Sequence, residues 1–212
     1  MQTIVVAGGA RDLDAVPAGW SGAFVIAADS GVDFALALGL HVDVAVGDFD
    51  SVSPDGLQRV RADGGRVESH PSAKDQTDLE LALHGAMRQG ATDLLVLGVG
   101  GGRLDHLMAN LLLLASPEYA PCRVRAVAGC TRVHVVRGGQ PATELRGELG
   151  ELLSLLAVGG PATGITTRGL LYSLHGEALA AGTSRGVSNV VESTPASVEL
   201  EDGTLLAIFP GR

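Results

Sequence analysis

Three aspartates, each just after an apolar segment, are the first residues whose types and spacing could do chemistry. Asp29 follows the apolar run 23–28. Asp48 and Asp50 follow the β-branched run 42–46. Because side chains alternate along an extended segment, Asp48 and Asp50 are expected on the same side, roughly 6–7 Å apart. Mg²⁺ takes oxygen ligands, commonly one or two carboxylates plus substrate phosphates. The pattern therefore predicts a Mg²⁺–phosphate site; the alternative is a solvated turn in which Asp29 caps the following helix.

A second polar cluster, 74–81 (KDQTDLEL), opens a predicted helix. Asp75 is a natural N-cap, and Asp78 three residues later completes something like a capping box. This structural interpretation does not explain three further polar residues at the start of the same helix, namely Lys74, Gln76 and Thr77. Free N–H groups at a helix N-terminus, with a lysine beside them, also suit phosphate binding. The residue types leave both interpretations open.

A glycine-rich segment, 98–110 (GVGGGRLDHLMAN), joins a predicted strand to a predicted helix. It fits neither the P-loop nor the dinucleotide-binding fingerprint, but its glycines let the backbone approach a ligand closely. Arg103 offers a planar fork suited to phosphate oxygens, and Asp105 either caps the helix or binds metal. His106 and Asn110 are four residues apart and share a helical face; a purely structural role for His106 remains the alternative.

Two turn-rich polar segments near the C-terminus form a third candidate. They are 164–174 (GITTRGLLYSL) and 186–189 (GVSN). Tyr172 could stack on a flat ligand, with Ser188 and Asn189 supplying hydrogen bonds. Turn chemistry alone is the competing explanation.

The elements that position these residues alternate in the first half of the chain. The expected strands are 3–7, 23–28, 42–46, 66–69 and 93–97, and the expected helices are 30–38, 54–63, 76–89 and 104–115. This alternation indicates a mainly parallel, Rossmann-like sheet covered by helices on both faces. Ligands of such sheets bind beyond the carboxyl ends of the strands. We therefore expect Asp29, Asp48 and the segment 98–103 to share one crevice.

After about Pro121 the helical periodicity disappears. Short apolar runs recur at 124–128, 133–136, 152–156, 170–174, 187–191, 197–200 and 205–209. These runs predict an all-β second domain, a sandwich or partial barrel, although the first run is also compatible with the N-terminal sheet. With 137–142 (RGGQPA) as the linker, we expect an α/β catalytic, nucleotide-binding domain at 1–137 and a β-sandwich at 143–212.

Composition restricts the class of protein. The 212 residues carry a net charge of −9 and only 3% aromatic side chains, which argues against nucleic-acid binding. The two cysteines form no C-x-x-C pair, so a disulfide framework or thiolate zinc site is unsupported. No apolar stretch reaches the length of a membrane span, and the N-terminus lacks a basic region of a signal peptide. We expect a cytoplasmic protein without a membrane partner.

Taken together, these segments resemble the thiamine pyrophosphokinase family. The matches, in the family's order, are Asp29–Gly31, Gly47–Ser51 (G-D-x-D-S), Lys74–Asp78 (K-D-x-T-D), Gly101–His106 (G-G-R-x-D-H) with Asn110, and Thr166–Leu170 (T-T-x-G-L) with Ser188 and Asn189. Each motif is weak alone, and five in order are specific. Two departures are Ser30, where the family usually has glycine, and Tyr172, where some relatives have tryptophan.

The resemblance implies an enzyme that converts ATP and thiamine to AMP and thiamine diphosphate. It also implies a homodimer with active sites at the subunit interface. The hypothetical site has three groups of residues: metal ligands Asp29, Asp48, Asp50 and Asp75; catalytic residues Asp48, Asp50, Asp78 and Arg103; and substrate contacts Lys74, Asp75, Gln76, Thr77, Arg103, Asp105, His106, Asn110, Tyr172, Ser188 and Asn189. Mg²⁺ is the expected cofactor, and ATP the co-substrate.

Two other functions use the same residues. A regulator could bind thiamine or nucleotide without turnover, but a binder does not need so many acidic side chains around a metal. A Mg²⁺-dependent nucleotide hydrolase could use the same acids and would release AMP without thiamine.

Overall fold

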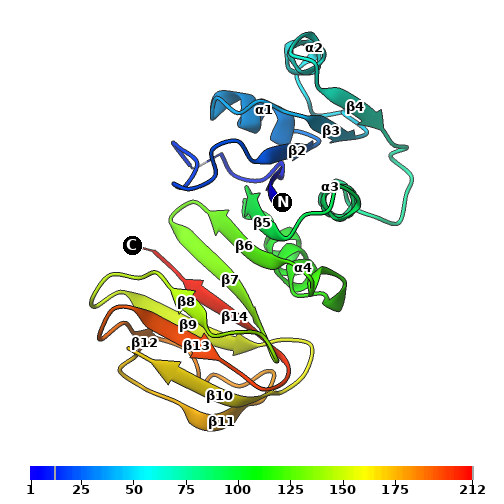
Figure 1. Ribbon diagram of the computed structural model, residues 1–212. Helices are drawn as coiled ribbons and strands as arrows, with labels where there is room; N and C mark the ends of the chain where they lie inside the picture. The colour runs from blue at the N-terminus through cyan, green and yellow to red at the C-terminus, as the bar shows by residue number, and fades with distance from the viewer. Residues whose placement is uncertain (12, 212) are drawn as a thin grey trace. The chain divides into compact units, whose positions relative to one another are not determined.

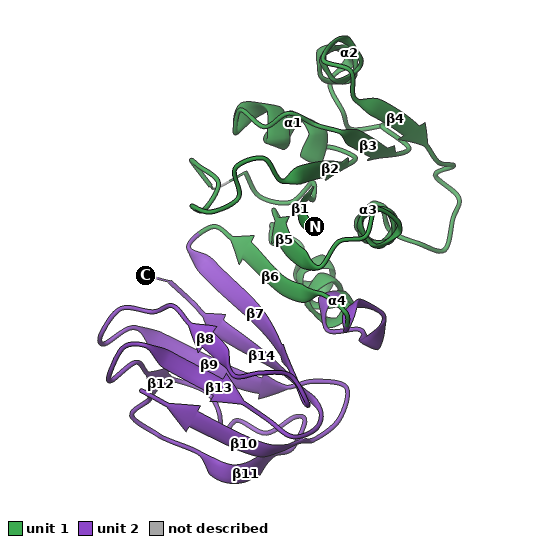
Figure 2. Ribbon diagram, in the orientation of Figure 1, with its two compact units in different colours: residues 1–113, 121–129 green, residues 114–120, 130–212 purple. Residues whose placement is uncertain are grey.

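The computed structural model describes residues 1–11 and 13–211, and these separate into two units (Figure 2). Unit 1 takes the described residues within 1–113 and 121–129. Unit 2 takes those within 114–120 and 130–211. Within the described part of the chain, no helix combines the length and the apolar character that crossing a bilayer requires.

Unit 1 is built on six parallel strands in the order β6-β5-β1-β2-β3-β4. The strands are β1 (Gln2–Val6), β2 (Phe24–Ala28), β3 (Val44–Gly47), β4 (Arg66–Ser69), β5 (Asp93–Leu97) and β6 (Arg123–Ala128). The helices are α1 (Gly31–Ala37), α2 (Pro54–Ala62), α3 (Asp78–Arg88) and α4 (Leu104–Leu114), whose last residue belongs to unit 2. Runs of four consecutive buried residues in β1, β2, β3 and β5 are typical of strands covered on both faces.

The helices cover this sheet from two sides. Helices α1 and α2 pack beside β2, β3 and β4, and α3 packs across β1, β2 and β3 from the opposite side (Figure 1). One apolar core joins the strands to α1, with Ile4, Phe34 and Leu95 among its buried members. All five strands and all four helices expected in this half are confirmed, with shifts of up to two residues at their ends. The open question about the run 124–128 is also answered, because β6 pairs in parallel with β5.

The start of α3 differs from the expectation. Thr77, not Asp75, is the N-cap: its backbone is extended, and its hydroxyl accepts a hydrogen bond from Glu80 N at 3.2 Å. The assignment of Asp75 as the cap was therefore wrong by two residues. Asp78 is the first residue of the helix, where a carboxylate is favoured by the free N–H groups.

Unit 2 holds two antiparallel sheets and a short 3₁₀ turn, η1 (Pro117–Tyr119). Its strands are β7 (Thr131–Arg137), β8 (Thr143–Leu145), β9 (Leu152–Ala157), β10 (Ala162–Arg168), β11 (His175–Leu179), β12 (Asn189–Val190), β13 (Ala196–Glu199) and β14 (Thr204–Phe209). Within the unit, the sheet orders are β12-β9-β14-β7 and β11-β10-β13-β8. Apolar side chains from both sheets form one core, exemplified by Leu155, Ile165, Val198 and Phe209. The expected second domain rich in β-strands is confirmed.

The strand expected at 170–174 is wrong. This segment is a loop between β10 and β11, and only Leu170 forms an isolated bridge, to Val191. Gly169 has a φ of +71°, so the chain leaves the extended conformation there. The expected strand at 187–191 shrinks to the two residues of β12, because Ser188 has a φ of +60°. The segment 138–142 connects β7 to β8 inside unit 2.

Candidate active site

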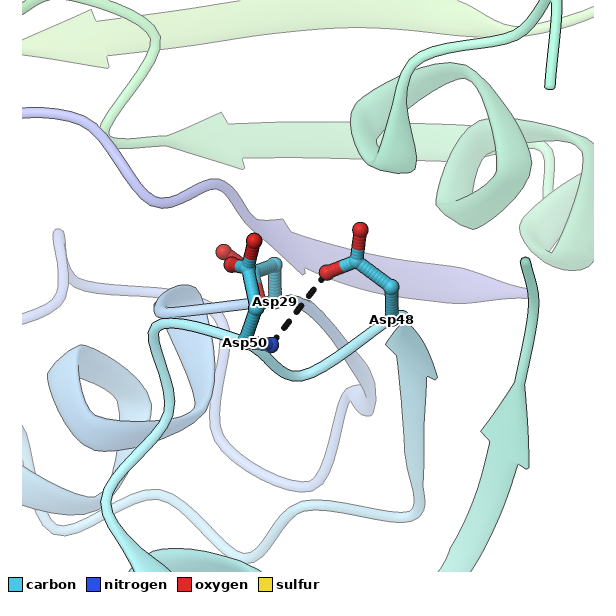
Figure 3. A group of neighbouring side chains, drawn as sticks. All are labelled: Asp29, Asp48 and Asp50. Atoms are coloured by element: carbon cyan, nitrogen blue, oxygen red, sulfur yellow. Dashed lines mark hydrogen bonds between the residues drawn. The ribbon is translucent and has the colours of Figure 1, made fainter. Parts of the chain in front are cut away.

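Neighbouring strands bring the three aspartates together at one edge of the unit 1 sheet. Strands β2 and β3 run in parallel with Ala28 opposite Val46, and Asp29 N extends this ladder by donating to Val46 O at 2.9 Å. Carboxylate oxygens of Asp29, Asp48 and Asp50 all lie within 4.8 Å of one another (Figure 3). The predicted convergence is confirmed, and it occurs at the carboxyl ends of the strands.

The backbone reaches this arrangement by a route different from the one expected. Phe49 has a φ of +62°, so Asp48 and Asp50 do not alternate along an extended segment, and that part of the reasoning was wrong. The turn is closed by Asp50 N, which donates to Asp48 Oδ1 at 3.3 Å (Figure 3). Asp29 is itself at a φ of +47°. Ser30, not Asp29, occupies the N-cap position of α1, so the capping alternative for Asp29 is also wrong.

Ser51 links two of the three carboxylates. Its hydroxyl oxygen lies 2.8 Å from Asp29 Oδ2 and 2.8 Å from Asp50 Oδ1. One hydroxyl has one proton, so it can donate to only one of these oxygens at a time. Asp29 Oδ1 is buried and has no hydrogen-bond partner among the described residues. A buried carboxylate oxygen without a partner is costly unless something else satisfies it.

Asp48 is held in its charged form. A hydrogen bond from the Ser72 side chain lowers the pKa of Asp48 below its ordinary value of 3.8, and the backbone N–H of Asp50 and the positive charge of Lys74 add to this. An unpartnered buried oxygen, an ionised neighbour and a third carboxylate within 4.8 Å make a set of hard oxygen donors. This donor set fits Mg²⁺, which prefers carboxylate oxygen.

A cavity of about 710 Å³ lies within unit 1 beside Asp29. Two glycine-rich loops, after β1 and after β5, meet in its lining. Ala10 N donates to Gly100 O at 2.6 Å, and Gly9 N donates to Gly98 O at 3.1 Å. A Cβ atom at Gly9 would lie 1.9 Å from Gly100 O, so only glycine permits this approach.

Six predicted site residues line this cavity: Asp29, Thr77, Asp78, Arg103, His106 and Asn110. Asn110 Nδ2 donates to Val99 O at 2.9 Å, which fixes α4 against the loop after β5. Asp48 and Asp50 lie within 4.8 Å of Asp29 but do not line the cavity, so the expected crevice holds Asp29 and the segment 98–103 without Asp48. The structure thus brings together residues from four segments: the loops after β2 and β3, the start of α3, and the segment 103–110.

Three other predicted residues, Lys74, Asp75 and Gln76, do not line the cavity. Lys74 Nζ pairs with Asp78 Oδ1 at 2.9 Å and donates to Pro71 O at 3.1 Å. Gln76 Nε2 lies 3.1 Å from His84 Nδ1, on the same helix that Gln76 precedes. Asp75 is exposed, and it is not part of the group formed by Asp29, Asp48 and Asp50.

Arg103 points its guanidinium at Asp105. Nε and Nη2 of Arg103 donate to the two carboxylate oxygens of Asp105 at 3.2 and 2.5 Å. This pair raises the pKa of Arg103 and lowers the pKa of Asp105, chiefly through the hydrogen bonds. Both side chains are mostly exposed, so the pair is screened by water. A phosphate group can therefore compete with Asp105 for the same fork.

Three predicted residues belong to unit 2, namely Tyr172, Ser188 and Asn189. Tyr172 is 65% exposed, whereas Asn189 is only 5% exposed. The Asn189 side chain accepts a hydrogen bond from Tyr172 N and donates one to Tyr172 O. Ser188 is exposed, and its backbone N–H donates to Ser154 Oγ at 3.1 Å.

Sequence reasoning missed Ser51, Ser72 and the wall formed by Gly8, Gly9 and Ala10. Ser51 lies inside the G-D-x-D-S segment, so its proximity to the acids was a usable signal. The glycine pair after the first strand was another, because glycines at the carboxyl end of a parallel strand commonly face a ligand. Nothing in the sequence signals the contact between Ser72 and Asp48.

The fold and the site define a class: an α/β unit with acidic side chains and glycine-rich loops at the carboxyl edge of a parallel sheet, joined to a β-rich unit. Two family models match the chain, "Thiamin pyrophosphokinase, catalytic domain" over residues 18–126 and "Thiamin pyrophosphokinase, vitamin B1 binding domain" over residues 141–205. The chain belongs to the thiamin pyrophosphokinase family.

Individual relatives agree with this assignment. The chain is 26% identical over 211 residues to thiamine pyrophosphokinase of Bacillus subtilis, covering 98% of each chain. A crystal structure of thiamine pyrophosphokinase from Bacillus subtilis superimposes with a TM-score of 0.85 over 100% of both chains, at 26% identity. A thiamin pyrophosphokinase family protein from Enterococcus faecalis gives a TM-score of 0.83 over 98% of both chains, also at 26% identity.

Proposed function

We propose that this protein is a thiamine pyrophosphokinase, which transfers a pyrophosphoryl group from ATP to thiamine and releases AMP. Family membership supports the reaction. The observation that carries the proposal is the convergence of Asp29, Asp48 and Asp50 beside a cavity lined by Arg103. Cavities of several hundred Å³ are typical of small-molecule sites. Unit 1 is then the Rossmann-like nucleotide-binding part, within the proposed domain 1–137.

Asp29, Asp48 and Asp50 are the residues that would hold Mg²⁺. Asp29 offers a buried oxygen without a partner in the described chain, and Asp48 is kept ionised by Ser72. When bound, Mg²⁺ supplies positive charge that offsets the phosphates of ATP. The additional ligand role predicted for Asp75 would need that exposed side chain to move, since it lies outside the group of three.

In this proposal the thiamine hydroxyl oxygen attacks the β-phosphorus of ATP, the bond from that phosphorus to the bridging oxygen of AMP breaks, and the hydroxyl proton passes to a carboxylate. Such transfers depend mostly on positioning and charge stabilisation. Arg103 turns its fork from Asp105 to phosphate oxygens as charge develops. Lys74 and Asp78 form one ion pair at the mouth of α3, which places the lysine charge there.

Other side chains bind the nucleotide in this proposal. Thr77 and the N-terminus of α3 face the cavity, as do His106 and Asn110 of α4. Gln76 contacts ATP after its hydrogen bond with His84 breaks. Asp105 orients Arg103 by accepting hydrogen bonds from its guanidinium.

Unit 2 supplies the thiamine side, as a β-sandwich within the proposed domain 143–212. Tyr172 is exposed, and the flat thiazolium or pyrimidine ring of thiamine stacks on its ring in this proposal. Ser188, the residue before Asn189, is also exposed. We further propose a homodimer with its active sites at the subunit interface. Leu104, Met108 and Leu112 repeat every four residues along α4 and are 70%, 55% and 53% exposed. An exposed apolar stripe of this kind is typical of a protein interface.

One assay tests the function. Purified protein is mixed with ATP and Mg²⁺, with and without thiamine, and AMP and thiamine diphosphate are separated and quantified. Thiamine-dependent formation of both products in equal amounts is the expected result. AMP release without thiamine would instead identify a nucleotide hydrolase, and binding of thiamine without any AMP would identify a regulator.

A further inference from the structure

Asn189 occupies an unusual place for a residue expected to contact a ligand. It lies on β12, opposite Leu153 of β9. Only 5% of the residue is exposed, although its amide is fully polar. A buried amide must be satisfied by hydrogen bonds, so its partners define its role.

Those partners are backbone groups of the loop that carries Tyr172. Asn189 Oδ1 accepts from Tyr172 N at 3.0 Å and from Val190 N at 2.9 Å, and Asn189 Nδ2 donates to Tyr172 O at 2.9 Å. Both lone pairs of the amide oxygen are thus used, together with one of its two N–H bonds. The opposite orientation of the amide would point donors at two N–H groups, so the network allows only this one.

The rest of the loop is fixed in the same way. Leu171 N donates to Val190 O at 2.9 Å, and Ser173 Oγ donates to Leu170 O at 2.8 Å. Leu174 N donates to the buried Thr167 hydroxyl at 2.8 Å. Between these anchors, the Tyr172 ring is the part that projects, with the residue 65% exposed. Hydrogen bonds thus hold the loop backbone around an exposed tyrosine.

We infer that Asn189 is a positioning residue that holds the Tyr172 loop by both backbone groups of Tyr172, so that the ring is presented in one orientation to a flat cationic ligand. This inference rests on the proposed function for the identity of that ligand, thiamine. Asn189 then acts through Tyr172, and only one N–H of its amide remains for another hydrogen bond. Fixing the ring before binding lowers the ordering cost of binding.

Two substitutions separate this role from direct contact. Asn189→Asp keeps the oxygen that accepts from Tyr172 N and Val190 N, and replaces the donor to Tyr172 O by a second oxygen. Asn189→Ala removes all three hydrogen bonds. Gln140→Glu makes the same amide-to-carboxylate change at an exposed position between β7 and β8, and is the matched control. If Asn189→Ala does not fold, Asn189→Asp alone carries the kinetic test.

The expected kinetic result is a thiamine KM raised on the order of tenfold in Asn189→Asp, the scale of an aromatic stacking contact, with the KM for ATP unchanged. In a Tyr172→Ala background, Asn189→Asp should add less than about twofold, because residues that act as one unit are not additive. If the two fold-changes multiply instead, Asn189 touches thiamine directly and the inference is overturned.

A readout without catalysis separates this inference from the proposed function. Amide hydrogen exchange, followed by NMR, should show a slow Tyr172 N–H in the unsubstituted protein and a fast one in Asn189→Ala, with Gln140→Glu unchanged. Equal exchange rates in all three proteins would overturn the positioning role. Thiamine-independent AMP release by the unsubstituted protein would refute the proposed function and leave the exchange result standing.

Discussion

The Ser51 hydroxyl lies 2.8 Å from Asp29 Oδ2, which ties the loop after β3 to the residue that follows β2. The same hydroxyl lies 2.8 Å from Asp50 Oδ1, so it connects two proposed metal ligands. Residues that orient metal ligands typically change metal affinity or activity 10- to 100-fold when removed. In the proposed metal site, the orientation of Asp29 and Asp50 would therefore depend on a side chain that is not itself a ligand.

Ser51→Ala should raise the Mg²⁺ concentration needed for half-maximal activity about tenfold, since Asp29 and Asp50 lose their common partner. The measurement is activity against Mg²⁺ at saturating ATP and thiamine. Ser21→Ala, at an exposed turn, is the control. An unchanged Mg²⁺ requirement in Ser51→Ala would show that the hydroxyl does not organise the carboxylates.

Asp50→Asn should abolish turnover and leave Tm unchanged or raised, because it removes one of three like charges within 4.8 Å. Mg²⁺ at ten times its Kd should stabilise the unsubstituted protein by about 1.4 kcal/mol, a rise in Tm of about 3–5 °C. This rise should disappear in Asp50→Asn and persist in Asp63→Asn, whose exposed carboxylate lies at the end of α2. Calorimetry with and without Mg²⁺ provides the comparison. Normal turnover by Asp50→Asn would remove the metal role.

Arg103→Ala should lower kcat by about 10²–10³, the scale for losing one group that stabilises transition-state charge. Its Tm should change little, because mostly exposed ion pairs contribute little to stability. Arg59→Ala, which breaks another exposed pair in unit 1, is the control for charge and surface effects. A large loss of Tm in Arg103→Ala would favour a structural role for the pair with Asp105.

The carboxyl edge of the unit 1 sheet was predictable because apolar runs and glycines mark strand ends directly. Asp29 and Asp48 follow two such ends, and pairing of β2 with β3 makes them neighbours. The positive φ of Phe49 could not be predicted, because position 49 holds neither glycine nor asparagine, the residues that commonly adopt such a φ. The acids converge through that turn and not through alternation. Convergence was therefore predicted correctly for a wrong local reason.

Unit 2 was harder because its strands mix polar and apolar residues. β10 contains three threonines and a glycine around one buried isoleucine, Ile165, so it has no apolar run that would predict a strand. The apolar run at 170–174 predicted a strand, yet the backbone N–H groups of Tyr172 and Leu174 donate to the side chains of Asn189 and Thr167. Asn189 was predicted to contact a ligand because it lies in a polar, turn-rich segment and belongs to the Ser-Asn pair of the family resemblance. Its burial depends on pairing with β9, which local sequence does not encode.

Asp48 gives the site a defined response to pH. Its pKa is lowered first by the Ser72 hydrogen bond, so this bond stabilises the folded state above the ordinary pKa of 3.8 and the effect is lost as pH falls through the lower folded value. Ser72→Ala should therefore raise the pKa of Asp48 in metal-free protein, measured by ¹³C NMR of its carboxyl group. The Tm difference from the unsubstituted protein should shrink between about pH 7 and about pH 3. An Asp48 pKa unaffected by Ser72→Ala would contradict this assignment.

Gly9→Ala tests whether the meeting of two loops shapes the cavity. The added Cβ would lie 1.9 Å from Gly100 O and 2.2 Å from Gly98 O, so the loops after β1 and β5 must separate. Overpacking of this kind costs about 1–3 kcal/mol, and we expect a lower Tm together with a raised KM for ATP. Gly102→Ala is the matched control in the same region, because its Cβ would meet nothing within 4 Å. Its Tm should equal that of the unsubstituted protein. If the two variants have the same Tm and the same KM for ATP, the contact between Gly9 and Gly100 does not shape the cavity, and side chains alone bind the nucleotide.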